Sequence, residues 1–150
     1  MAEAVAGQRL GARNLTEPVS PKAFLQLREQ LLQTPDSAPL GRWVKWFLAD
    51  RSTRTISPFS ALSVPDHVRR LVDENTLESL REATRLDPTN GLAYARLAKA
   101  ILAADPKKNP RTVAEADFLS RHSLNCSPTD PEVKRLRGEI AAAVKIPVPK

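Results

Sequence analysis

The stretch "ESLREATRLDPTNGLAYARLAKAILAADP", Glu78 to Pro106, contains two helical patterns separated by a sharp turn. Alanine and leucine recur at helical spacing on both sides of Asp87-Pro88-Thr89-Asn90. Because proline cannot continue a helix, the first pattern must end at this turn and a second helix must follow it. The stretch therefore predicts a helical hairpin, either one hairpin of an ordinary domain or one unit of a repeating scaffold.

A second turn further along the chain is similar to the first. "LDPTN" and "CSPTDP" each follow a helical pattern with small residues and leucine, and each precedes another helical pattern. Pro88 and Pro128 are 40 residues apart, and periods in this range are typical of stacked helical repeats. Two antiparallel helices cannot bury both apolar stripes alone, so each hairpin needs a neighbour. The spacing favours a repeat, with an unrelated α-hairpin bundle as the alternative.

The residues around these turns resemble the tetratricopeptide repeat. Its consensus runs from Trp, Leu, Gly and Tyr on a first helix to Ala, Phe and Pro on a second. The positions that match it in spacing are Tyr94, Leu97, Ala98 and Ile101, then Ala116, Ser120 and Pro128, and in the preceding half unit Thr76, Leu80, Ala83 and Pro88. The resemblance covers residues 76–144 and implies a half repeat, one full repeat and a closing helix.

Three features depart from that pattern. The period is about six residues longer than the usual ~34, and "PKKNPR" between the paired helices is the insertion. Ser120 stands where the family has an aromatic residue, and Phe118 and Leu119 are expected to fill its volume. Thr76 stands in place of an alanine.

A second resemblance covers the segment that runs from "WFLADRSTRTISPFS" to "LDPTNGLA". It is similar to helical extensions that follow β-propeller repeats in large bacterial multidomain proteins, some of which carry protein-kinase-like domains. The resemblance implies a tail module of such a protein or a stand-alone relative of it. The chain has no glycine-rich phosphate loop and no His-Arg-Asp or Asp-Phe-Gly motif, so it does not resemble a kinase itself.

Helical periodicity predicts the organisation of the whole chain. Helices are expected at residues 21–33, 40–50, 66–86, 91–104, 113–126 and 131–144, where 66–86 is either one helix or two that meet near "ENT". Residues 1–19 are expected to be a flexible leader, 20–65 N-terminal helices with a proline-containing connector, 66–144 the repeat region and 145–150 a flexible tail. The prediction is an all-α, antiparallel stack of helix hairpins, a tetratricopeptide-like α-solenoid fragment with an N-terminal helical cap.

Composition and cysteine content limit the class of protein. The 150 residues suffice for one domain with a modest core, and 5 glycines with 5% aromatic residues argue against a β-sandwich. No run approaches the ~18 apolar residues of a membrane span, and the N-terminus lacks the apolar core of a secretory signal. The single cysteine, Cys126, fits a reducing compartment. We expect a cytoplasmic protein that does not bind membranes.

The sequence offers few groups for catalysis or metal binding. His67, His122 and Cys126 are scattered, whereas a structural zinc site usually needs four closely spaced ligands. Cys126 falls where the repeat places a buried leucine, so a packed thiol is expected and a Cys–His pair formed in space is the alternative. No phosphate-binding glycine motif or nucleophile elbow is present. We therefore predict a protein that is not an enzyme and has no cofactor.

Positive charge gathers in the C-terminal third, where residues 91–150 carry 11 basic and 6 acidic side chains. The cluster consists of Lys107, Lys108, Arg111, Lys134, Arg135 and Arg137. Such a cluster contacts nucleic-acid phosphates or an acidic peptide, or is an ordinary solvated surface. Aromatic residues for stacking bases are missing near it, which argues against single-strand binding. In the N-terminal region, Trp43, Trp46 and Phe47 are expected to be core, with an exposed partner-binding patch as the alternative.

The function predicted from these patterns is a non-catalytic module for protein–protein interaction or scaffolding. The tetratricopeptide resemblance implies that first helices line a concave partner-binding surface. On that basis the candidate partner-binding residues are Arg96, Lys99, Lys134 and Arg137, and the partner is another protein or domain, with an acidic one as an option. The alternatives are a nucleic-acid-associated protein that uses the basic third and a purely structural domain of a larger assembly.

Overall fold

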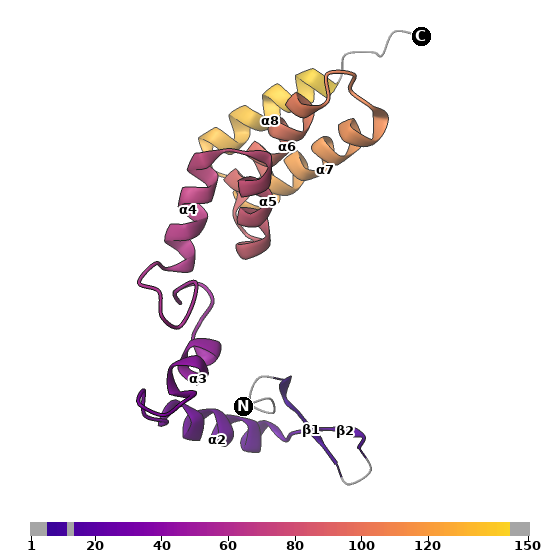
Figure 1. Ribbon diagram of the computed structural model, residues 1–150. Helices are drawn as coiled ribbons and strands as arrows, with labels where there is room; N and C mark the ends of the chain where they lie inside the picture. Colours follow the sequence, from indigo (N-terminus) through magenta and orange to yellow (C-terminus); the bar gives the residue numbers. More distant parts are fainter. Residues whose placement is uncertain (1–5, 12–13, 145–150) are drawn as a thin grey trace. The chain divides into compact units, whose positions relative to one another are not determined.

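The computed structural model describes residues 6–11 and 14–144, so the predicted tail at 145–150 lies outside the described residues. Within them the chain is mostly helical, which confirms the all-α prediction. It divides into two compact units, unit 1 (Met1–Val64) and unit 2 (Pro65–Lys150), which we describe separately (Figure 1). The elements, in order, are β1 (Gln8–Leu10), β2 (Thr16–Pro18), α2 (Pro21–Leu32), α3 (Gly41–Leu48), α4 (Val64–Glu74), α5 (Leu77–Leu86), α6 (Gly91–Ala104), α7 (Pro110–Cys126) and α8 (Pro131–Val144).

Unit 1 begins with a short antiparallel ribbon, in which β1 pairs with β2 and Arg9 lies opposite Glu17. No periodicity indicated these strands, because three residues are too few to display an alternating pattern. The following helix, α2, starts as its sequence predicts, with the Ser20 side chain accepting a hydrogen bond from the Ala23 amide and Pro21 in the first turn. Helix α2 is tied to α3 by Arg28, whose Nη2 donates to the carbonyl of Leu48 at 3.2 Å.

Two helices, α4 and α5, occupy the segment 66–86 that allowed one helix or two. Asn75 interrupts the helical backbone with φ +55°, a left-handed conformation that asparagine tolerates better than most residues. Thr76 and Ser79 then form a capping box, in which the Thr76 side chain accepts from the Ser79 amide at 3.1 Å and the Ser79 hydroxyl accepts from the Thr76 amide at 3.0 Å. This reciprocal cap starts α5 in a new direction.

The two turns singled out in the sequence have the same hydrogen bonds. At the first turn, the Asp87 amide donates to the Ala83 carbonyl at 2.9 Å and the Asn90 amide donates to the Asp87 carbonyl at 3.2 Å. The counterparts 40 residues later are Ser127 to Ser123 at 3.0 Å and Asp130 to Ser127 at 3.4 Å. In both turns the last residue then caps the next helix, with Asn90 accepting from Ala93 and Asp130 from Val133. The α5–α6 and α7–α8 junctions are thus equivalent in backbone structure.

The core of unit 2 lies between α5, α6, α7 and α8. Its buried apolar cluster comprises Leu80, Leu97, Ala98, Ile101, Ala116 and Ile140. Small residues bring α6 and α7 close: a Cβ on Gly91 would lie 2.6 Å from the Ser123 carbonyl oxygen. The buried hydroxyls of Ser120 and Ser123 donate to the carbonyls of Asp117 and Ser120, so they leave no polar group unsatisfied.

Two sequence-based predictions about α7 are wrong. The helix begins at Pro110, after Asn109 at the N-cap position, and not at residue 113. Proline is well suited to the first helical position, so Thr112 and Glu115 lie inside the helix and form no capping box. Phe118 is 68% exposed and does not fill the space beside Ser120, whereas Leu119 packs against the core.

Candidate interaction surfaces

The two arginines among the four predicted partner-binding residues make part-buried contacts between helices. Arg96 lies on α6, and its Nη1 donates to the Val72 carbonyl at the end of α4, 2.8 Å away. Arg137 lies on α8, and its Nη1 contacts Asp117 Oδ1 at 2.8 Å and Ser120 Oγ at 3.0 Å on α7. Both guanidinium groups join neighbouring helices, so neither is free to meet a partner without loss of a structural contact.

The two lysines of the predicted set lie on the surface of unit 2. Lys99 Nζ is 2.8 Å from Glu139 Oε2, and both side chains are well exposed. Lys134 on α8 is exposed and has no side-chain partner among the described residues. Arg135 adds a third cation to this surface and pairs with Glu132 and Glu139. The result is a row of alternating charges that joins α6 to α8.

The pKa values of the two carboxyl groups in this row are lowered. For Glu132 the chief cause is the hydrogen bond from Arg135, and for Glu139 it is the hydrogen bond from Lys99. Both carboxylates therefore keep their charge at neutral pH and neutralise most of the positive charge that the sequence places here.

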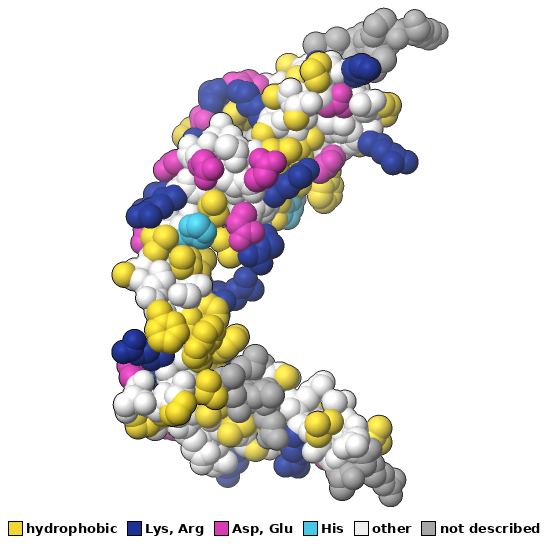
Figure 2. All heavy atoms as spheres, in the orientation of Figure 1, with side chains coloured by type: hydrophobic (Ala, Val, Ile, Leu, Met, Phe, Trp, Pro, Cys, Tyr) yellow, Lys and Arg dark blue, Asp and Glu magenta, His cyan; other side chains and the backbone are white. Residues whose placement is uncertain are grey.

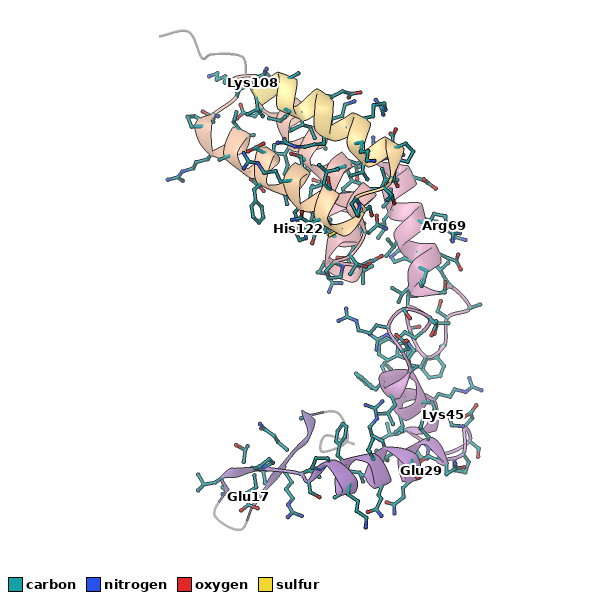
Figure 3. All side chains as sticks on the ribbon, turned by 180° about the vertical axis from the view of Figure 1, so that it is seen from behind. Glu17, Glu29, Lys45, Arg69, Lys108 and His122 are labelled. Atoms are coloured by element: carbon teal, nitrogen blue, oxygen red, sulfur yellow. The ribbon has the colours of Figure 1, made fainter. Side chains whose placement is uncertain are left out.

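The rest of the predicted basic cluster is dispersed. Lys108 lies in the α6–α7 loop with φ +49°, and its Nζ donates to the Ala143 carbonyl in the last turn of α8 at 3.1 Å. Figure 3 shows Lys108 beside that end of α8. Lys107 and Arg111 are exposed. The cluster is therefore not one continuous surface of unpaired cations, because Lys108, Arg135 and Arg137 are used inside unit 2.

Cys126 and His122 come together on α7, one helical turn apart. Cys126 Sγ lies 3.5 Å from His122 Nε2 and 3.7 Å from the Pro88 carbonyl oxygen. The Tyr94 ring meets the His122 ring edge-on at 4.6 Å, and burial, followed by the charge of Cys126, raises the pKa of Tyr94. The thiol is half-buried in this packing. Within residues 6–11 and 14–144, no three His, Cys, Asp or Glu side chains are grouped so that they could hold a metal ion.

The aromatic residues of α3 form a cluster that is partly exposed, with Trp46 half-buried, contrary to the core packing expected from the sequence. Trp43 is 38% exposed and Phe47 is 42% exposed, and Phe59 from the following loop joins them at 67%. The Trp43 and Phe59 rings meet edge-on at 6.1 Å, and Trp46 contacts Phe47 at 5.1 Å. Helix α2, the helix expected to pack on them, has no buried residue of its own. Figure 2 shows hydrophobic side chains gathered around α3 and the loop after it.

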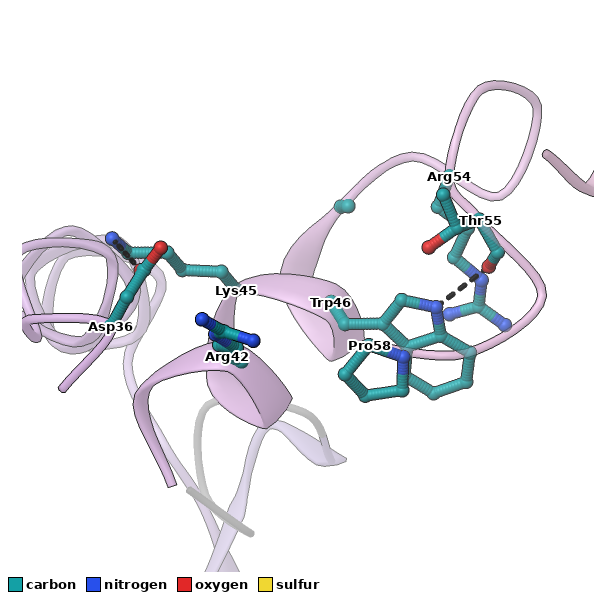
Figure 4. Close-up of a pocket in the computed structure, with 8 residues that line it drawn as sticks. Asp36, Arg42, Lys45, Trp46, Arg54, Thr55 and Pro58 are labelled. Carbon is teal, nitrogen blue, oxygen red and sulfur yellow. Dashed lines mark hydrogen bonds and ion pairs between the residues drawn. The ribbon is translucent and has the colours of Figure 1, made fainter. Parts of the chain in front are cut away.

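A cleft of about 390 Å³ adjoins this cluster. Three cations, one carboxylate and the Trp46 ring line the cleft. The full lining is Asp36, Arg42, Lys45, Trp46, Ala49, Arg54, Thr55 and Pro58 (Figure 4). Trp46 is fixed by its indole N–H, which donates to the Thr55 carbonyl at 2.7 Å. The Arg54 guanidinium carbon lies 4.2 Å from the centre of the Trp46 ring, within the range of a cation–π contact.

Charge in this cleft is not balanced. Asp36 is held by Lys45 at 2.6 Å, and this hydrogen bond is the main reason that the pKa of Asp36 is lowered. Arg42 and Arg54 make no ion pair with a carboxylate in the described part of the chain; each lies over an aromatic ring instead, Arg42 over Phe59 and Arg54 over Trp46. The cleft therefore carries two cations without a carboxylate at ion-pair distance. The charge of Arg42 also helps to lower the pKa of Asp36, and the Nε of Arg54 is buried without a hydrogen-bond partner.

Comparison of the chain with protein-family models, with curated proteins and with solved structures finds no match. None of the helices in the described part of the chain combines the length and apolar character needed to cross a bilayer.

Proposed function

We propose that the protein is a non-catalytic helical-repeat module that binds another protein, with unit 2 as a tetratricopeptide-like scaffold. The observation that carries the proposal is the pair of equivalent junctions, α5–α6 and α7–α8, with the same turn hydrogen bonds at a spacing of 40 residues. Repetition of one hairpin is how stacked-helix proteins build an extended binding surface. The protein's single cysteine cannot form an internal disulfide, which fits the cytoplasmic location that we propose.

Contacts between alternate helices support this proposal. Helix α6 contacts α4 through the Arg96–Val72 hydrogen bond and contacts α8 through the Lys99–Glu139 ion pair. In a stacked-hairpin protein, alternate helices of this kind line one face and the remaining helices line the other. The binding face of unit 2 in this proposal is the exposed side of α6 and α8. Its exposed cations are Lys134, which is unpaired among the described residues, and Lys99, whose exposed ion pair with Glu139 costs little to break.

The proposal is tested by reversing the charge of the two lysines. Arg96 and Arg137 are left unchanged, because their side chains join helices and their loss would disturb the fold. The Lys99→Glu/Lys134→Glu variant of the full chain is used as bait for chemical cross-linking in a cell extract, beside the wild type. We expect the wild type to be cross-linked to a partner that the variant loses.

A matched control carries the same change of charge on the other helices. The Arg81→Glu/Arg111→Glu variant alters two exposed cations on α5 and α7. It should keep the partner of the wild type. Loss of the partner by both variants to the same degree, or by neither, would contradict a binding face on α6 and α8. Far-UV circular dichroism of each variant establishes that its helices are retained.

A further inference from the structure

Unit 1 has far less core than unit 2. In its described residues, 6–11 and 14–64, Val44 at 4% exposure is the one buried hydrophobic side chain. Most of the large hydrophobic side chains that the described structure exposes lie in this unit, and Phe118 is the exception in unit 2. Three of these side chains are in contact through Trp43, which meets Phe47 and Phe59, and an exposed apolar patch of this kind often marks an interaction site. Unit 1 therefore presents apolar area that a partner could cover.

The exposed part that is best defined is the α3 patch, formed by Arg42, Trp43, Trp46, Phe47, Arg54 and Phe59. Aromatic residues and arginine are the side chains most enriched where protein interfaces concentrate their binding energy. The rings pack against one another edge-on, and the Trp46 N–H is satisfied by Thr55. The patch is thus ordered before any partner arrives, which lowers the entropy lost on binding.

The charge of the patch indicates the chemistry of its partner. Arg42 and Arg54 have no carboxylate partner among the described residues, and the one acid in the cleft, Asp36, is already held by Lys45. A guanidinium that lies over an aromatic ring keeps its N–H groups in the plane, where a carboxylate can accept two of them. An acidic segment of a partner would supply the countercharge that Arg42 and Arg54 lack among the described residues.

The aromatic rings argue for a protein segment over a nucleic acid. Single strands bind by stacking bases on free aromatic faces. One face of the Trp46 ring is covered by Arg54 at 4.2 Å, and one face of the Phe59 ring lies under Arg42 at 5.8 Å. Ring edges and the remaining exposed surface suit apolar side chains better than stacked bases.

We propose that the α3 patch binds an acidic segment of a partner protein, whose carboxylates meet Arg42 and Arg54 and whose apolar side chains rest on Trp43, Phe47 and Phe59. This site adds to the surface of unit 2 in the proposed function. Either can fail without the other, because the two surfaces share no residue.

The protein contains a spectroscopic reporter for this site. Its 2 tryptophans are Trp43 and Trp46, both in the patch, so intrinsic tryptophan fluorescence reports on the patch alone. The probe is a synthetic decapeptide without tryptophan in which Asp and Glu alternate with Phe and Leu. Titrated into the full chain, it should shift the tryptophan emission to shorter wavelength in a saturable way. The same peptide with lysine in place of every acidic residue should leave the emission unchanged.

Arg42→Gln is the principal variant, because the Arg42 side chain makes no hydrogen bond or ion pair among the described residues that folding would lose and contacts the Phe59 ring. This variant should lower the affinity for the acidic peptide by about tenfold, the factor that corresponds to one charge-assisted contact. Phe47→Ala removes an exposed ring of the patch and should also lower the affinity for the acidic peptide. Lys22→Gln removes an equally exposed cation on α2 and should leave the affinity within about twofold of the wild type, since exposed charges away from a site contribute little.

Several results would overturn the proposal. One is an acidic peptide that fails to change the emission of the folded chain, and another is equal binding by the lysine peptide. Tighter binding of oligo-deoxythymidine than of the acidic peptide would assign the patch to nucleic acid. A larger emission shift with phosphatidylserine vesicles would assign it to a lipid surface. Unchanged affinity in both Arg42→Gln and Phe47→Ala would place the peptide elsewhere on the chain.

Discussion

Replacement of Arg96 by methionine tests whether this side chain holds α4 in place. Arg96 Nη1 donates to the Val72 carbonyl at 2.8 Å. Val72 lies in the last turn of α4, where carbonyls have no partner within the helix, and the neighbouring Leu71 carbonyl is already taken by the Asn75 amide. Methionine keeps most of the apolar stem and removes the charged donor, so the variant isolates the hydrogen bond.

The size of the effect follows from the contact. A hydrogen bond from a charged donor contributes about 1.5–3 kcal/mol, and a cation at a helix C-terminus adds about 0.3–1 kcal/mol. Arg96 is half-buried, and methionine retains part of its packing, so we expect Arg96→Met to lower the free energy of unfolding of unit 2 by about 2 kcal/mol. With a urea dependence of about 1–2 kcal/mol per molar, the unfolding midpoint should fall by about 1–2 M.

The assay separates the two units of the full chain. Far-UV circular dichroism in urea follows the helices, most of which lie in unit 2, whereas tryptophan emission follows unit 1 alone. Only the first signal should shift. Lys99→Met is the control: its ion pair with Glu139 joins side chains that are 55% and 41% exposed, and such pairs contribute about 0–1 kcal/mol. A wild-type midpoint for Arg96→Met, or equal midpoints for the two variants, would refute the structural role of Arg96.

Three further predictions concern the core and the acid stability of unit 2. Replacement of the fully buried Leu80 by alanine should lower the free energy of unfolding by about 2–5 kcal/mol, measured from the unfolding midpoint in urea. A loss below about 1 kcal/mol would contradict its place in the core. Gly91→Ala would put a Cβ 2.6 Å from the Ser123 carbonyl oxygen, so it should destabilise the chain by about 1–3 kcal/mol, although alanine normally favours a helix; a more stable variant would show that α6 and α7 are not in close contact there. Burial raises the pKa of Asp117, but hydrogen bonds from Arg121 and Arg137 outweigh it and leave the pKa below its ordinary value. The stability from this carboxylate is therefore present above the unfolded pKa of about 3.9 and is lost as the pH falls through the folded pKa. The fall in unfolding midpoint below about pH 4 should be less steep in Asp117→Asn than in the wild type, and equal slopes would contradict this assignment.

Local sequence signals were sufficient for most of the helices of unit 2. Helices 91–104 and 131–144 have the predicted bounds, because Asn90 and Asp130 cap their first turns and prolines or turn residues precede them. The predicted start of α7 is wrong because two competing helix-start signals, Pro110 and the Thr112–Glu115 pair, lie close together. Proline at the first helical position loses only an amide that would have no partner there, so the earlier start is favoured.

The roles of the charged and aromatic residues could not be predicted in the same way, because they depend on contacts between distant segments. Arg96 reaches a residue 24 positions away, and Lys108 reaches one 35 positions away. Nothing in the local pattern distinguishes these side chains from Lys134, which stays exposed. The exposure of Trp43 and Phe47 likewise cannot be predicted from the helical spacing of α3 alone.

Contacts within the fold change which basic residues we expect to bind an acidic partner. The basic third of the sequence holds the greatest excess of positive charge, but three of its long side chains serve the fold: Lys108 meets the end of α8, Arg135 bridges two carboxylates and Arg137 joins α8 to α7. A cation that is already paired gains little from a new partner, because the old contact must first be broken. Arg42 and Arg54 have no ion pair to break, since they lie over aromatic rings without a carboxylate, and the buried Nε of Arg54 leaves its terminal nitrogens as the donors for a ligand. The α3 patch can therefore offer more available positive charge than the basic C-terminal third, which is why we place the acidic ligand there.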